Sequence, residues 1–254
     1  MGITMMEKNT IGIEELKWAI FLYNTFGEYG DYIYDSLEVR KGIERGEPGT
    51  AVVSFLNHFR MRVSGKRVPP LINKWYADEG MKLLDSLKSP LSETDLNSDN
   101  VSRIITQLYD GLTRISSIKA TSASKILHIL RPELFVMWDN EISRHYQQNS
   151  DMGKGEESYV HFLRRMQAII KDLQAQNNQI AKLLSRGVVR FFEGNLESLD
   201  PGKDEERISQ LKKSIDFLNS GGITLPKFID EYNWVVFSKK IKVPPDWTPC
   251  SVDL

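Results

Sequence analysis

Apolar residues recur at intervals of three and four positions along most of this chain, which is the period of an amphipathic α-helix. Polar turns rich in glycine, proline, serine or asparagine separate these periodic stretches and give each helix a start and an end. The pattern predicts ten helices, at residues 13–23, 32–43, 51–59, 71–87, 101–115, 123–130, 140–148, 159–184, 206–218 and 225–241.

Strand-like alternation is scarce. The run 188–192 is the best candidate for a strand, and one short run does not make a sheet. We therefore expect an all-α fold with two helical lobes. Residues 101–150 would form a central segment, and part of the N-terminal region (residues 1–100) would pack with the C-terminal region (residues 151–254).

The composition is that of a globular protein that can bury a sizeable core. The 254 residues carry 33 Lys and Arg against 34 Asp and Glu, a net charge of −1. This balance argues against strong non-specific binding to nucleic acid, although it allows a local basic face. Cys250 is the single cysteine, which excludes an intrachain disulfide and a metal cluster held by several cysteines of this chain. We expect a cytoplasmic location, because neither a signal peptide nor a long apolar span is evident.

The segment 121–139, TSASKILHILRPELFVMWD, carries the most chemical information. Thr121 or Ser122 can cap a short helix that ends at Arg131-Pro132. Its apolar stripe follows the i, i+3, i+4, i+7 spacing and consists of Ala123, Ile126, Leu127 and Leu130. The polar residues that lie off this stripe are Ser124, Lys125 and His128. A brief apolar run then ends in one carboxylate, Asp139.

The start of this helix has the features of an anion site. Backbone N–H groups and the positive end of the helix dipole suit a DNA phosphate, and Lys119 adds charge just before the helix. The same pattern also fits an ordinary capped helix of the core, and spacing alone favours that second interpretation.

Residues 101–145 resemble the helix-hairpin-helix DNA glycosylase superfamily, the group of endonuclease III and 8-oxoguanine glycosylase. That family carries a hairpin of the form L-P-G-V-G-x-K-T-A, then a helix and an apolar segment, and then D-x-x-I-x-R. Ala123 matches the alanine of the hairpin, and Asp139 lies sixteen residues later, at the spacing of the family. Asp139, Ile142 and Arg144 match D-x-x-I-x-R.

The hairpin departs from the family pattern in two places. Ser117-Ile118-Lys119 stands where the family has Gly-Val-Gly, whose glycines adopt positive φ and approach a phosphate closely. Thr121 occupies the position of the Schiff-base lysine, which argues against a lyase step through an amine there. Members of the family without lyase activity keep only the aspartate, so the second departure leaves base excision open.

The resemblance implies a DNA repair glycosylase that hydrolyses the N-glycosidic bond of a damaged base flipped out of double-stranded DNA. Asp139 would stabilise the charge that develops on the sugar or activate the attacking water. Trp138 would line the base pocket, and no metal or cofactor would be needed. The residues expected at the DNA backbone are Ser117, Lys119, Thr121 and Ser122. The alternative role of Asp139 is the N-cap of helix 140–148, and this role is compatible with catalysis.

A basic cluster lies further upstream, at Arg60, Arg62, Lys66 and Arg67. Arg60 and Arg62 could grip the phosphates of a duplex. A solvated loop is the simpler interpretation of the same charges. The four histidines show no metal-ligand spacing, and the glycine-rich motifs of nucleotide-binding sites are missing from the sequence.

The leading hypothesis is therefore a base-excision glycosylase with Asp139 as its carboxylate. The alternative is a catalytically inactive helix-hairpin-helix scaffold that binds DNA or a protein partner, which the neutral charge and the missing hairpin glycines favour. A helical interaction module unrelated to DNA is the third possibility.

Overall fold

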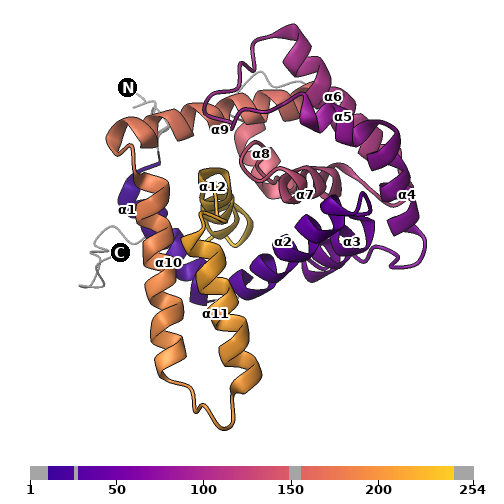
Figure 1. The fold of residues 1–254 in the computed structure, drawn as a ribbon. Helices are drawn as coiled ribbons and strands as arrows, with labels where there is room; N and C mark the ends of the chain where they lie inside the picture. The colour runs from indigo at the N-terminus through magenta and orange to yellow at the C-terminus, as the bar shows by residue number, and fades with distance from the viewer. Residues whose placement is uncertain (1–10, 26–27, 149–155, 243–254) are drawn as a thin grey trace, which may run out of the picture.

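The computed structural model describes residues 11–25, 28–148 and 156–242, and in these residues every regular element is a helix (Figure 1). The all-α prediction is thereby confirmed. The elements are α1 (Ile13–Thr25), α2 (Glu28–Glu44), α3 (Gly49–His58), α4 (Val68–Trp75), the π-helix η1 (Tyr76–Gly80), α5 (Met81–Asp85), α6 (Asp99–Thr113), α7 (Ala120–Leu130), α8 (Asn140–Gln148), α9 (Glu156–Gln176), α10 (Ile180–Glu197), α11 (Glu205–Asn219), α12 (Leu225–Asn233) and the π-helix η2 (Trp234–Ser238).

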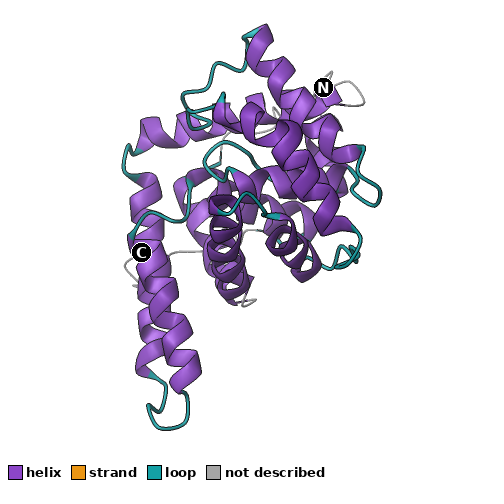
Figure 2. Ribbon diagram, turned by 45° about the vertical axis from the view of Figure 1, so that its right-hand side comes forward, coloured by secondary structure: helices purple, strands orange, loops and turns teal. Residues whose placement is uncertain are grey.

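Helix α12 lies at the centre of the arrangement and packs against α1, α9 and α10 (Figure 1). Helices α2, α3 and α6 contact α7, which carries the candidate site, and α9 packs along α6. Helices α10 and α11 form a long hairpin that extends away from the rest of the chain (Figure 2). Contacts of α1 with α12 and of α2 with α11 join the first helices of the chain to the last.

The prediction of a single helix over residues 159–184 is wrong, because this stretch contains the end of one helix and the start of another. Helix α9 ends at Gln176 and α10 begins at Ile180. The Asn177 side-chain oxygen accepts a hydrogen bond of 2.9 Å from the backbone N–H of Gln179, which makes an asparagine turn between them. Buried apolar residues continue on both sides of this turn, at Leu173 and Ile180, so the apolar period alone conceals the break.

The possible strand at 188–192 is also wrong, since these residues lie inside α10. Val188, Val189 and Phe192 are buried, a spacing that places them on one face of a helix. The β-branched valines suggested a strand, and packing of the whole helix overrides that weak local preference.

Candidate functional site

Helices α6 and α7 pack against each other and are joined by residues 114–119, and we refer to this pair as the α6–α7 hairpin. Ser117 adopts φ 76°, a left-handed conformation that glycine takes far more readily than serine. Ile118, the next residue, is buried. A serine therefore holds the backbone conformation at the position where the family pattern has its first glycine.

The N-cap of α7 is Lys119, so the prediction of Thr121 or Ser122 as the cap is wrong. Lys119 is extended, with φ −109° and ψ 177°, and its carbonyl accepts the N–H of Ala123 at 2.8 Å. No side chain of the described residues caps this first turn. Ser117 and Lys119 are exposed, whereas Thr121 is half-buried and the Ser122 side chain is buried. Among the four predicted phosphate contacts, only Ser117 and Lys119 therefore present exposed side chains.

Helix α7 is buried on all its faces from Ser122 to Leu130, including the polar residues that lie off the apolar stripe. The cause is its position, because α2, α3 and α6 contact it and the apolar segment 134–138 covers it as well. The three polar side chains that lie off the stripe, Ser124, Lys125 and His128, each have a partner. His128 Nδ1 donates to the carbonyl of Phe135 at 2.7 Å, and its Nε2 accepts the Tyr32 hydroxyl at 3.0 Å.

The apolar segment that leads to Asp139 is fastened to the helices around it. Ser124 Oγ accepts the backbone N–H of Trp138 at 3.2 Å and lies 3.1 Å from the Trp138 carbonyl. The Tyr159 hydroxyl donates to the carbonyl of Val136 at 3.0 Å. These contacts hold Trp138, and with it Asp139, beside the first turns of α7.

Asp139 is half-buried, and both of its carboxylate oxygens have partners. Oδ1 accepts the backbone N–H groups of Glu141 and Ile142 at 2.8 and 2.9 Å, so Asp139 caps α8 as predicted. Oδ2 accepts the hydroxyl of Ser238, from the π-helix η2, at 2.5 Å. Sequence reasoning missed Ser238, because no local pattern links two residues that lie 99 positions apart.

Trp138 belongs to an aromatic cluster of the core and is 5 % exposed. Its indole N–H donates to the Tyr109 hydroxyl at 3.2 Å, and its ring packs against those of Tyr159 and Phe162 at centroid distances of 5.3 and 5.4 Å. This is the core role that the sequence also allows for Trp138, and its role in a base pocket stays a prediction.

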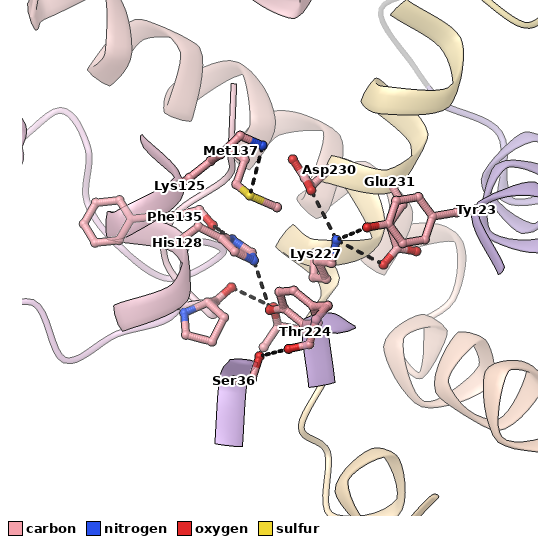
Figure 3. A network of polar contacts seen from close by, with 12 residues as sticks. Tyr23, Ser36, Lys125, His128, Phe135, Met137, Thr224, Lys227, Asp230 and Glu231 are labelled. Atoms are coloured by element: carbon pink, nitrogen blue, oxygen red, sulfur yellow. Dashed lines mark hydrogen bonds and ion pairs between the residues drawn. The ribbon is translucent and has the colours of Figure 1, made fainter. Parts of the chain in front are cut away.

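A network of buried polar and charged side chains lies between α7 and α12 (Figure 3). Lys227 of α12 is fully buried, with its ammonium 3.4 Å from Asp230, 3.6 Å from Glu231 and 3.3 Å from the Tyr23 hydroxyl. The ammonium also sits over the rings of Tyr23 and Tyr32, at 4.6 and 4.5 Å. Burial opposes its charge, yet the negative groups together raise the pKa of Lys227 above its ordinary value.

The network reaches the candidate site through Lys125 and Asp230. Lys125 Nζ lies 3.9 Å from Met137 Sδ and 3.9 Å from the centre of the Phe59 ring. Burial raises the pKa of the Asp230 carboxyl, the positive charges of Lys227 and Lys125 oppose this shift, and the negative charge of Asp139 adds to it. Asp139 therefore stands within electrostatic reach of a second, buried carboxyl group. No local pattern singles out Asp230, because it lies on α12, far along the chain from Asp139.

Arg60 and Arg62 lie on an exposed loop after α3. Both residues have positive φ, 58° and 53°, which is uncommon outside glycine and costs conformational energy. The Asn57 side chain closes the loop, because it donates to the carbonyl of Val63 at 3.0 Å and accepts the N–H of Val63 at 2.7 Å. The Phe59 ring beneath Lys125 joins this loop to α7.

Among the described residues, no group of three or more His, Cys, Asp and Glu side chains is placed to hold a metal ion. None of the described helices combines the length and the hydropathy that a bilayer-spanning segment needs.

Comparison with known proteins adds no assignment: no family model, no curated protein and no solved structure matches this chain.

Proposed function

We propose that this chain binds double-stranded DNA through the α6–α7 hairpin and hydrolyses the N-glycosidic bond of a nucleotide turned out of the duplex. The observation that carries the proposal is the Ser124 contact with the Trp138 backbone, which holds Asp139 next to the first turns of α7. The start of α7, which would bind a phosphate, and the carboxylate of Asp139 are thus held at a fixed distance from each other. A reaction at a sugar that lies between two phosphates requires such fixed positions.

The phosphate contact would use Lys119 and the backbone N–H groups at the start of α7, where the helix dipole is positive. The left-handed Ser117 turns the chain into this helix without the glycines of the family pattern. Lys125 lies six residues after Lys119, about 9 Å along the helix axis. Lys125 itself is buried, but its contact with Phe59 places the loop with the exposed Arg60 and Arg62 beside α7, where these two arginines would add phosphate contacts.

In the proposed reaction, the bond between the base and the sugar carbon breaks, and the departing base takes the bonding electrons. The water that adds to the sugar supplies the proton that the base gains and the hydroxyl group that replaces it. Positive charge develops on the sugar as the bond breaks, and the carboxylate of Asp139 stabilises this charge while the water adds to the same carbon. Oδ1 accepts two N–H groups at the start of α8, so Oδ2 is the oxygen that would face the sugar. It would first have to give up its hydrogen bond from Ser238. Thr121 provides no amine, and the reaction ends with hydrolysis.

This proposal includes a two-lobed glycosylase-like arrangement. Helices α6, α7 and α8 would form one lobe, and α1 with α10 and α12 would belong to the other. The contacts of α8 with η2, which follows α12, include the hydrogen bond between Ser238 and Asp139, and they support a boundary close to Asp139.

A catalytically inactive scaffold that binds DNA is the second candidate, and one observation favours it. Both oxygens of Asp139 are already engaged, by two backbone amides and a hydroxyl, which is the arrangement of a purely structural cap.

One experiment separates the two candidates. Duplexes that carry single uracil, 8-oxoguanine, alkylated or deaminated bases are incubated with the protein, and alkali then reveals the abasic sites. Asp139→Asn keeps an oxygen that can cap α8, so it tests chemistry with little effect on folding. The proposal predicts abasic sites with the wild type and none with the variant, at equal DNA binding. Absence of abasic sites with both proteins on the whole panel contradicts the enzyme and leaves the scaffold.

DNA binding has its own test. Lys119→Glu is expected to weaken duplex binding and to reduce the slope of log affinity against log salt by about one or more. Lys212→Glu on α11 is the matched control, because Lys212 is exposed and lies on the projecting hairpin. Equal effects of the two variants contradict a phosphate site at the start of α7.

A further inference from the structure

An open cleft of about 930 Å³ lies between the α10–α11 hairpin and the helices α2 and α3. Its apolar wall consists of Ile33, Leu37, Phe192 and Leu211. Small-molecule sites have volumes of this order, and they combine apolar walls with a few convergent polar groups. Asp139 and the hairpin residues 114–119 do not line this cleft.

A histidine held by a buried carboxylate faces the cleft. His58, the last residue of α3, lines the cleft with 40 % of its side chain exposed. Its Nδ1 lies 2.6 Å from Oδ2 of Asp35, whose side chain is 1 % exposed. A carboxylate on one ring nitrogen fixes the orientation of the imidazole and directs the other nitrogen away from the carboxylate.

Two residues of α11, Lys213 and Ser214, line the same cleft, and neither side chain has a polar partner among the residues that the structure describes. Ser214 is 7 % exposed, and its hydroxyl makes no hydrogen bond within the described part of the chain. Because Ser214 lines the cleft, its hydroxyl is a group that can bond a ligand there. Lys213 lies next to it and forms no ion pair with any described residue.

The acidic residues of the cleft lie at its other end. Glu205 and Glu206 belong to the first turn of α11, and Glu206 precedes Ser214 by eight residues, or about 12 Å along the helix axis. Arg207 lies at that outer end, beside the two acids. Lys213 is therefore the charged α11 residue closest in sequence to the Ser214 hydroxyl.

We propose that the inner end of this cleft, formed by His58, Lys213 and Ser214, binds a small organic anion with an apolar body. Lys213 supplies the positive charge, while His58 and Ser214 supply hydrogen-bonding groups for a phosphate or a carboxylate. Phe192 and Leu37 cover the apolar part of the ligand. This site is independent of the proposed action on DNA.

Titration of the full chain with three aromatic probes tests the site. Phenyl phosphate, benzoate and the neutral benzyl alcohol differ in the group that would meet Lys213. The imidazole signals of His58 are followed by NMR and assigned by their loss in His58→Gln, and calorimetry with the same probes gives a second measurement that needs no assignment. We expect saturable binding of at least one of the two anions, with a much higher affinity than that of benzyl alcohol. The anion with the higher affinity shows whether the site prefers a phosphate or a carboxylate.

The neighbouring lysines of α11 provide a matched control. Lys213→Glu is expected to weaken anion binding at least about tenfold, the effect of one lost charge-assisted contact. Lys212→Glu makes the same charge change on the same helix, but Lys212 does not line the cleft, so binding should be unchanged. The proposal is overturned by an absence of saturable binding of both anions, by equal binding of benzyl alcohol, or by equal losses in the two lysine variants.

Discussion

Ser238 Oγ donates a hydrogen bond of 2.5 Å to Asp139 Oδ2, and so ties the end of the π-helix η2 to the start of α8. The other oxygen of Asp139 caps α8. One carboxylate therefore connects two helical segments that lie far apart in the sequence, and its removal has a structural as well as a chemical consequence.

The capping role predicts a difference between two substitutions of Asp139. Asp139→Ala removes the acceptor of two N–H groups and should lower the free energy of unfolding by about 1–2 kcal/mol. Asp139→Asn keeps one oxygen as an acceptor, so the free energy of unfolding should fall by only a small fraction of that amount. Denaturant unfolding of both variants measures the difference, and equal losses would show that the cap contributes little.

The left-handed Ser117 predicts opposite effects of glycine and valine. Ser117→Gly removes the steric cost of φ 76° and should be neutral or stabilising by up to about 1 kcal/mol. Ser117→Val should destabilise by about 1–2 kcal/mol, because a β-branched residue fits this conformation poorly. Thermal unfolding is the measurement, and Ser116→Val is the control at the neighbouring exposed position. Equal effects of the two valine substitutions would contradict a strained hairpin.

The burial of His128 leads us to expect a loss of stability on acidification. Burial, reinforced by the positive charge of Lys227, lowers the pKa of His128 from 6.5 to about 3 in the folded chain. The neutral His128 makes its full contribution to the free energy of unfolding above pH 6.5. This contribution is lost as the pH falls towards 3, because the histidine then takes up a proton in the unfolded chain but not in the folded chain. The loss by pH 5 is roughly 2 kcal/mol. Unfolding free energies measured between pH 7 and 5 should fall more steeply for the wild type than for His128→Gln, and parallel curves would contradict a buried neutral histidine.

The buried network predicts a large effect at Lys227. Lys227→Met leaves Asp230 and Glu231 buried without their shared cation and should lower the free energy of unfolding by about 3–5 kcal/mol at neutral pH. Protonation of the carboxyl groups should reduce this loss at acidic pH. Unfolding curves at two pH values provide the measurement. A small loss that does not depend on pH would show that the network is not the main electrostatic feature of the core.

Much of the fold could be predicted from the sequence, because amphipathic helices carry their period in their own residues. The α6–α7 pair, the apolar segment 134–138 and the cap at Asp139 all follow from such local patterns. The break at Asn177 was missed, since one asparagine turn interrupts the chain without interrupting the apolar period.

The surroundings of the candidate site could not be predicted in the same way. Ser238, Asp230 and Lys227 approach α7 through tertiary packing, and no spacing rule relates them to Asp139. The burial of Lys125 and His128 has the same origin, because segments on every side of α7 cover residues that lie off its apolar stripe. The cleft beside His58 depends on the placement of the α10–α11 hairpin, which contacts α2 far from it in sequence.

The decisive measurement for the role of Asp139 is release of the base under single-turnover conditions. Wild type and Asp139→Asn are mixed in excess with the lesion-bearing duplex that the wild type cleaves best, at a salt concentration where both bind fully. We expect the wild type to release the free base and to leave an abasic site, and the variant to release none in the same time. Equal release by the two proteins would contradict the role assigned to Asp139.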